Sequence, residues 1–171
     1  NILHHPRVLP VQPHHRLVHE HRPGPVQEAA KDGAIPSTSV ADLISKLQAP
    51  RAVWVMVPAG EITETTLIKV GDVLEPGDAV IDGGNSYYVD DIRRSKELAA
   101  KHIDYVDVGT SGGVWGLQRG YCMMIGGPKA TVQRLDPIFK TLAPGRGHIE
   151  RTPGRQTPSP EADGSSEEGY L

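Results

Sequence analysis

Short apolar runs alternate with amphipathic segments through the middle of this 171-residue chain. Apolar residues dominate positions 52–57, 79–82 and 104–108, and Pro or Gly follows each run. Runs of this kind are typical of strands that are buried on both faces of a sheet. We therefore predict strands at these three positions and a fourth at residues 17–20.

Three further segments carry apolar residues at helical spacing. Residues 39–47 begin with Ser39, which can cap a helix, and Asp42 follows three positions later. Residues 90–102 and 130–142 each place a stripe of residues on one helical face. The predicted stripes are Ile92, Leu98, Ala99 and His102 in the first, and Val132, Leu135, Ile138, Phe139 and Leu142 in the second. Pro137 removes a backbone donor, so we expect a bend there.

Strand and helix alternation of this kind predicts an α/β fold with a parallel sheet covered by helices. The pattern occupies residues 16–143, and a His- and Pro-rich stretch without a clear period precedes it at residues 1–15. Residues 144–171 are rich in Pro, Gly, Ser and Glu and predict a linker or a disordered tail, since so few apolar residues cannot offset the ordering entropy. Tyr170, at the end of that segment, has no predicted role.

Composition excludes several classes of function. The net charge is −3 and aromatic residues make up 5% of the chain, so neither a polyanion nor a stacked base is an expected partner. No apolar run approaches the roughly 18 residues that span a bilayer, and the first residues do not form a secretory signal. A single cysteine, Cys122, excludes an internal disulfide framework and a four-thiolate zinc site. We expect a cytoplasmic protein with no nucleic-acid or membrane partner.

Three of the predicted strands end in small, polar or glycine-rich residues, at 57–60, 82–86 and 109–113. In parallel sheets, ligands bind beyond the carboxyl ends of the strands. We therefore predict one ligand crevice that the three segments share. The alternative is that each is an ordinary glycine-rich turn.

The segments VWVMVPAGEITE, VIDGGNSYYVDDIRRSKEL and YVDVGTSGGVWGLQRGYCMMIGG resemble, in this order and spacing, the coenzyme domain of decarboxylating 6-phosphogluconate dehydrogenases. The likeness is nearest to the shorter bacterial type. It implies a Rossmann-like, doubly wound parallel sheet, NADP or NAD as coenzyme, 6-phosphogluconate as substrate and a homo-oligomer for full-length members. The implied reaction is a hydride transfer from C3 of the substrate and loss of CO2, which gives ribulose 5-phosphate in the pentose phosphate pathway.

The resemblance also implies roles for single residues. Val57, Pro58 and Ala59 match a loop beside the nicotinamide ribose, and Asn85 matches an asparagine between coenzyme and substrate. Ser111, Gly112 and Gly113 match the segment that holds the substrate carboxylate through hydroxyl and backbone N–H groups. Next to them, Cys122, Met123 and Met124 are predicted to be core residues of a strand.

The chain departs from the family at both ends. It contains no Gly-x-Gly-x-x-Gly, whose backbone would receive the coenzyme pyrophosphate. The likeness begins at RLVHE, taken as the second strand, which places Glu20 against the adenosine ribose. An acid there favours NAD, whereas Arg22 could serve NADP, and the choice stays open. In the family, a catalytic lysine and glutamate belong to a helical second domain, so no catalytic residue is assigned, and we expect the chain to be incomplete.

Six of the 8 histidines lie near the N-terminus, where such a density could bind zinc or nickel. No cysteine or carboxylate framework accompanies them, and a displaced reading frame or a cloning junction would produce the same stretch, so no metal site is predicted. Two functions remain open: a dehydrogenase of the family above, or a truncated, non-catalytic nucleotide-binding or interaction module.

Overall fold

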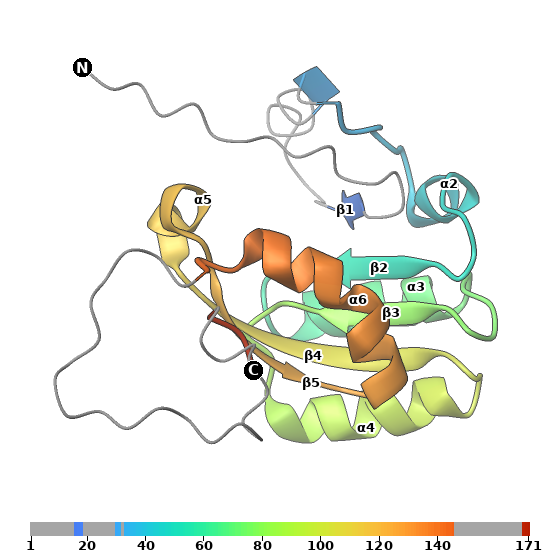
Figure 1. The fold of residues 1–171 in the computed structure, drawn as a ribbon. Helices are drawn as coiled ribbons and strands as arrows, with labels where there is room; N and C mark the ends of the chain where they lie inside the picture. Colours follow the sequence, from blue (N-terminus) through green and yellow to red (C-terminus); the bar gives the residue numbers. More distant parts are fainter. Residues whose placement is uncertain (1–15, 19–29, 32, 146–168) are drawn as a thin grey trace, which may run out of the picture.

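The computed structural model describes residues 16–18, 30–31, 33–145 and 169–171 (Figure 1). They form a five-stranded sheet whose strands lie side by side in chain order. The strands are β1 (Arg16–Val18), β2 (Ala52–Val55), β3 (Ala79–Asp82), β4 (Asp104–Ser111) and β5 (Cys122–Gly126). The first four are parallel, and β5 runs antiparallel to β4. The α/β class and the strands predicted in the middle of the chain are confirmed. Of the strand predicted at 17–20, residues 17 and 18 belong to β1, and residues 19 and 20 lie outside the described part. Strand β5 is an antiparallel addition to the predicted sheet.

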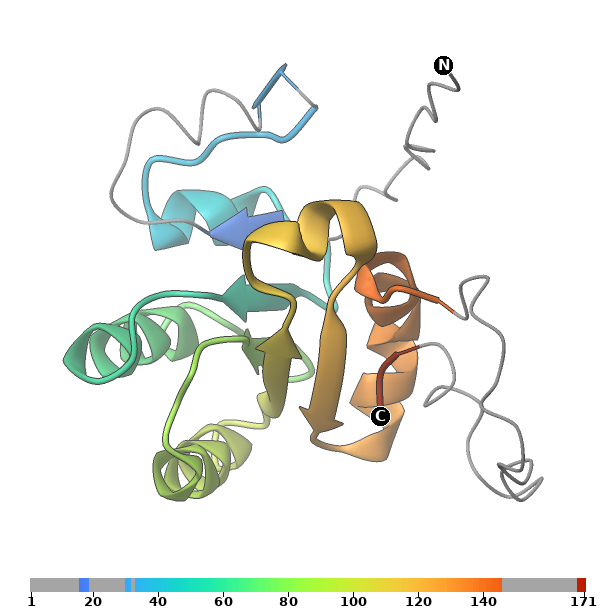
Figure 2. The same ribbon diagram turned by 90° about the vertical axis from the view of Figure 1, so that its left-hand side faces the viewer.

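Helices cover both faces of this sheet. They are α2 (Val40–Ser45), α3 (Glu61–Gly71), α4 (Tyr88–Ala99), the short 3-10 turn η1 (Gly113–Trp115), α5 (Gly116–Arg119) and α6 (Lys129–Leu142). Figure 2 shows α3 and α4 on one side of the sheet and α6 on the other. None of the helices described is long and apolar enough to cross a membrane.

Two apolar clusters fill the space between the sheet and its helices, because successive strand residues point to opposite faces. The cluster under α2, α3 and α4 includes Val53, Val55 and Val80. The cluster under α6 includes Trp54 and Ile81, whose side chains alternate with the former set. Both β2 and β3 are buried at every position, as expected of central strands.

Sequence predictions succeed for two of the helices. Ser39 caps α2, and its hydroxyl accepts the Asp42 N–H at 3.0 Å. In α6, Leu135 and Phe139 are fully buried, and the other three residues of the predicted stripe are partly buried against the same cluster. Pro137 lies inside α6, and the bend expected there stays a prediction.

The predicted buried stripe of α4 is wrong except at Leu98. Ile92 is 51% exposed, and Ala99 and His102 are also exposed. The buried residues are instead Asp91, Arg94 and Leu98. A hydrophobicity pattern could not predict this buried face of α4, because the face contains charged side chains. These side chains are paired with one another underneath the helix.

The prediction that Cys122, Met123 and Met124 are all core residues is wrong for two of them. Met123 is buried, but Cys122 is exposed and Met124 is 73% exposed. They lie in β5, where neighbouring side chains point to opposite faces and only one face is covered by α6.

Residues 169–171 pair with β5, although they end the segment predicted as a linker or tail. Tyr170 forms a parallel bridge with Met123, and the Met123 N–H donates to the Gly169 carbonyl at 3.0 Å. The side chain of Tyr170 is buried in the cluster under α6. Tyr170 therefore has a structural role that its sequence context did not predict.

Candidate functional site

The three segments predicted to share a crevice lie at one edge of the sheet. Strands β2, β3 and β4 are parallel neighbours, so their carboxyl ends meet at the same edge. Figure 2 views the molecule from this edge. Val57, Pro58 and Ala59 follow β2, Asn85 follows β3, and Ser111 ends β4.

The loops after β2 and β3 are in close contact. The Gly83 N–H donates to the Val55 carbonyl at 2.9 Å, which continues the parallel pairing past the end of β3. A Cβ atom at Gly84 would lie 3.3 Å from the Val57 carbonyl oxygen, so glycine lets the two backbones approach. Asn85 itself is exposed.

The loop after β4 is built around two glycines. Strand β4 continues beyond its last pairing with β3, Asp82 with Asp107, and ends where Ser111 pairs with Cys122. Gly112 has a φ of 150° and Gly113 a φ of 50°, which side chains disfavour. A Cβ at Gly112 would also lie 3.0 Å from the Tyr121 ring. The Ser-Gly-Gly turn therefore needs its glycines for conformation, and Ser111 and both glycines are exposed.

Other predicted residues fall outside the part of the chain that the structure describes. Glu20, Arg22 and the N-terminal histidines lie in residues 1–15 and 19–29. Their predicted roles are untested. Within the described ranges, no group of three His, Cys, Asp or Glu side chains is placed to hold a metal ion.

A buried charged cluster lies beneath the loop of Asn85. It comprises Asp82, Asp91, Arg94 and Tyr105, and Glu64 joins it from α3. The Tyr105 hydroxyl lies 3.0 Å from an Asp82 oxygen and 2.9 Å from an Asp91 oxygen. The Arg94 guanidinium is 3.1 Å from Asp91 and 2.9 Å from Glu64. Each buried charge thus has an opposite charge or a hydroxyl as partner.

Burial and nearby charges shift the pKa values of two groups at this cluster, Tyr105 and Asp107. Burial, followed by the negative charge of Asp82, raises the pKa of the Tyr105 phenol, so the hydroxyl keeps its proton and acts as a donor. Burial, followed by the charges of Asp91 and Asp82, raises the pKa of Asp107. Sequence reasoning missed this cluster. One signal was available: Asp82 continues the inward-facing alternation of Val80 in β3.

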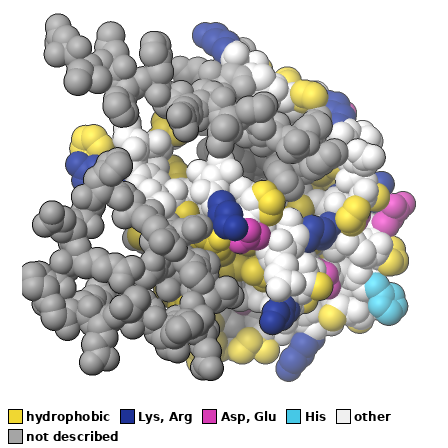
Figure 3. All heavy atoms as spheres, viewed as in Figure 1, with side chains coloured by type: hydrophobic (Ala, Val, Ile, Leu, Met, Phe, Trp, Pro, Cys, Tyr) yellow, Lys and Arg dark blue, Asp and Glu magenta, His cyan; other side chains and the backbone are white. Residues whose placement is uncertain are grey.

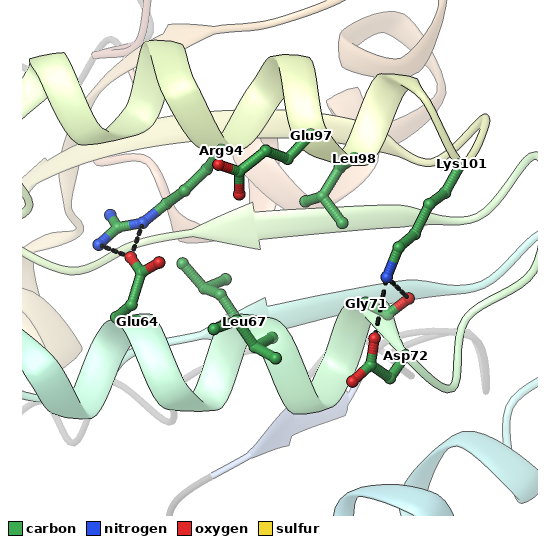
Figure 4. A pocket seen from close by; sticks show the side chains of 9 residues that line it. Glu64, Leu67, Gly71, Asp72, Arg94, Glu97, Leu98 and Lys101 are labelled. Atoms are coloured by element: carbon green, nitrogen blue, oxygen red, sulfur yellow. Dashed lines mark hydrogen bonds and ion pairs between the residues drawn. The ribbon is translucent and has the colours of Figure 1, made fainter.

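A groove between α3 and α4 has paired side chains at both ends (Figure 4). At one end Arg94 pairs with Glu64. At the other, the Lys101 ammonium donates to Asp72 at 2.9 Å and to the Gly71 carbonyl at 3.4 Å. A Cβ at Gly71 would lie 2.7 Å from the Leu98 side chain. Glycine at this position therefore lets α3 and α4 pack closely against each other.

Charged groups on the face in Figure 3 are dispersed. Lys and Arg side chains stand among acidic and uncharged ones rather than in one patch. The described part of this face therefore has no concentrated patch of one charge.

Comparison with known proteins identifies the family. Residues 11–150 match the model of the NAD binding domain of 6-phosphogluconate dehydrogenase. The chain belongs to this family. It is 40% identical over 127 residues to the NAD(+)-dependent, decarboxylating 6-phosphogluconate dehydrogenase of Haloferax volcanii, a match that covers 72% of this chain and 42% of that enzyme. The family assignment agrees with NAD or NADP as the predicted coenzyme.

Solved structures agree with this fold. The 6-phosphogluconate dehydrogenase of Plasmodium falciparum, studied in apo form and with NADP+ and 6-phosphogluconate, is 30% identical with a TM-score of 0.64, over 71% of this chain and 27% of that one. A 3-hydroxyisobutyrate dehydrogenase from Salmonella typhimurium has a TM-score of 0.63 at 22% identity, covering 71% of this chain and 42% of that one, which shows a shared fold alone. The chain thus spans less than half the length of these relatives.

Proposed function

We propose that this chain is the coenzyme-binding part of a 6-phosphogluconate dehydrogenase, which oxidises 6-phosphogluconate with NAD or NADP and releases CO2. One observation carries the proposal: the Val-Pro-Ala, Gly-Gly-Asn and Ser-Gly-Gly segments of the family resemblance follow three adjacent parallel strands. Ligands of such sheets bind at that edge.

The residues at this edge suit the nicotinamide end of the coenzyme. Val57, Pro58 and Ala59 have small side chains, and Gly84 keeps the neighbouring loop close to them. The Asn85 side chain is exposed and has both a donor and an acceptor, as a carboxamide or a ribose hydroxyl requires. The coenzyme, when bound, accepts the hydride.

The loop after β4 suits the carboxylate end of the substrate. Ser111 offers a hydroxyl, and Gly112 and Gly113 allow backbone N–H groups to approach an anion without side chains between them. Their role is to orient the substrate so that C3 faces the nicotinamide. No acid or base for the proton transfers is assigned among the residues that the structure describes.

A second candidate function is a non-catalytic nucleotide-binding or interaction module. The sequence favours it in one respect, the lack of a Gly-x-Gly-x-x-Gly turn. Without it, the pyrophosphate would lose charge-assisted hydrogen bonds worth roughly 1.5–3 kcal/mol each. Losing two would weaken binding by about a hundredfold or more. We therefore expect this chain to bind the coenzyme weakly and to show no turnover alone.

Isothermal titration with NAD, NADP and 6-phosphogluconate tests the proposal. Asn85→Ala should weaken binding of coenzyme and substrate, and Ser111→Ala should weaken binding of 6-phosphogluconate alone. Gln133→Ala, on the exposed side of α6, is the control. Equal affinities in Asn85→Ala and Gln133→Ala would place the ligands elsewhere. Coenzyme binding without any affinity for 6-phosphogluconate would favour the non-catalytic module.

A further inference from the structure

The carboxylate of Asp82 lies directly beneath the loop that carries Asn85. Asp82 is the last residue of β3 and is fully buried. Its Oδ1 accepts the Gly84 N–H at 3.0 Å, and its Oδ2 accepts the Ser86 hydroxyl at 2.8 Å. These two donors flank Asn85 in the chain, so one carboxylate holds the loop on both sides of the exposed amide.

Two other elements hold this carboxylate from below. The Tyr105 hydroxyl of β4 lies 3.0 Å from Asp82 Oδ2 and 2.9 Å from Asp91 Oδ1, so the two carboxylates share its single proton. The Arg94 guanidinium of α4 lies 3.6 Å from Asp82 Oδ2 and is fixed in turn by Asp91 and Glu64. A buried carboxylate with partners on several sides has little freedom to move. The position of the loop is thus tied to β4 and, through Arg94, to α3 and α4.

Stability alone gives little reason for a charge at this position. Taking a carboxylate out of water is costly, and replacing buried ions by apolar residues is often neutral or stabilising. A hydrophobic residue would continue the inward-facing alternation of β3, in which Val80 belongs to the core. A hydrophobic side chain, however, could not accept from the Gly84 N–H and the Ser86 hydroxyl.

We infer that Asp82 is a positioning residue for the Asn85 loop, which it holds in the conformation that receives coenzyme and substrate. The inference rests on the proposed function for the identity of these ligands. The hydrogen bonds that fix the loop are made by the protein itself, so the loop is ordered before any ligand binds. Loss of Asp82 would leave the fold of the sheet but loosen the backbone around Asn85.

Asp78, which directly precedes β3, provides a matched control at the opposite end of that strand. It is 1% exposed, and it accepts from the backbone N–H groups of Arg51 and Glu75. Asp78→Asn and Asp82→Asn therefore make the same chemical change in equally buried carboxylates. Only Asp82 is at the carboxyl edge, where the candidate site lies.

The test combines hydrogen exchange at the Gly84 amide, read by NMR, with titration of NAD, NADP and 6-phosphogluconate. In Asp82→Asn we expect Gly84 exchange and ligand dissociation constants to rise about tenfold or more, the effect of losing one charge-assisted hydrogen bond. In Asp78→Asn both should stay within about twofold of the unsubstituted protein at a comparable loss of thermal stability.

Equal ligand affinities or equal Gly84 exchange in the two variants would overturn the inference. If Asp82→Asn does not fold, Ser86→Ala is the alternative variant, because it removes the hydrogen bond from the Ser86 hydroxyl to Asp82. An unchanged ligand affinity in Ser86→Ala would also overturn the inference. If the unsubstituted chain binds none of the three ligands, the proposed function fails. Gly84 exchange still decides whether Asp82 positions the loop in that case.

Discussion

At the scale of single residues, two buried carboxylates serve different purposes at opposite ends of β3: Asp78 directly precedes the strand and Asp82 is its last residue. Asp82 supports the loop at the carboxyl edge, whereas Asp78 closes the turn before β3. The Arg51 guanidinium lies 2.9 Å from Asp78. Burial would raise the pKa of Asp78, but hydrogen bonds from the Glu75 and Arg51 backbone and from the Arg51 side chain outweigh it and lower the pKa. Asp78 therefore stabilises the fold in its charged form.

Asp78→Asn should lower the free energy of unfolding at neutral pH by about 2 kcal/mol, because hydrogen bonds to a charged group are lost. The folded pKa of Asp78 lies below its unfolded value of about 3.9, so its contribution is present above that pH and is lost as the pH falls through the folded pKa. Urea unfolding at several pH values should show the difference from the unsubstituted protein shrinking in acid. Asp72→Asn, at an exposed ion pair, is the control. A difference that does not change with pH would contradict this account.

Gly83→Ala should destabilise the protein through the core beneath the candidate site. A Cβ at Gly83 would overlap the Trp54 indole nitrogen, and both residues are buried. Overpacking of this kind costs about 1–3 kcal/mol. Gly126→Ala, which has open space around the new methyl group, should change the stability little. Chemical denaturation compares the two, and equal midpoints would mean that Trp54 moves aside at little cost.

At the scale of elements, the far side of the sheet depends on a segment that is distant in sequence. Residues 169–171 lie beside β5, and the Leu171 N–H donates to the Met123 carbonyl at 3.0 Å. The Tyr170 ring packs against Phe139 of α6 at 6.3 Å between centroids. Its hydroxyl donates to Asp136 at 2.6 Å. This hydrogen bond, followed by that from Lys140, lowers the pKa of Asp136. One tyrosine thus connects β5 to α6.

Tyr170→Ala should therefore lower the free energy of unfolding by about 3–5 kcal/mol, the usual cost of removing a buried aromatic ring. Leu171→Ala is the neighbouring control, because its side chain is 70% exposed and its backbone pairing is kept. Thermal unfolding followed by circular dichroism measures both. If both substitutions have the same small effect, the C-terminal residues do not contribute to the core in solution.

At the scale of the whole molecule, the two apolar clusters share one sheet. Leu67 of α3 belongs to the first cluster and Trp54 of β2 to the second. Val53 and Val55 of the same strand point into the first cluster. Loss of either cluster exposes β2 on one face and removes support for the other cluster. The described domain should therefore unfold as one cooperative unit.

Leu67→Ala tests this cooperativity. In a Trp115→Phe background, Trp54 is the remaining tryptophan and reports on the cluster opposite Leu67. The substitution should cost about 2–5 kcal/mol, and Trp54 fluorescence and circular dichroism should report the same shifted transition. Ile68→Ala, at a residue that is 53% exposed, is the control. A Trp54 transition that does not shift would show that the two clusters unfold separately.

The sequence by itself determined the class of fold, the parallel strands and which three loops follow β2, β3 and β4. These features depend on local information: apolar runs predict β2 and β3, and glycines mark the turns after β3 and β4. Topology then follows, because parallel neighbours bring their carboxyl ends to one edge. Cys122 and Met124 were predicted incorrectly, because strand alternation cannot tell which face another element covers.

Only the tertiary structure decided which polar residues are buried and what they support. Asp91 and Arg94 belong to the buried face of α4 because Tyr105 and Glu64, from other elements, satisfy their charges. Tyr170 is buried because its segment returns to β5. The energy of burying a polar group depends on partners that lie far away in sequence. Hydrophobic periodicity contains no information about those partners, so the support beneath Asn85 could be found only in the folded chain.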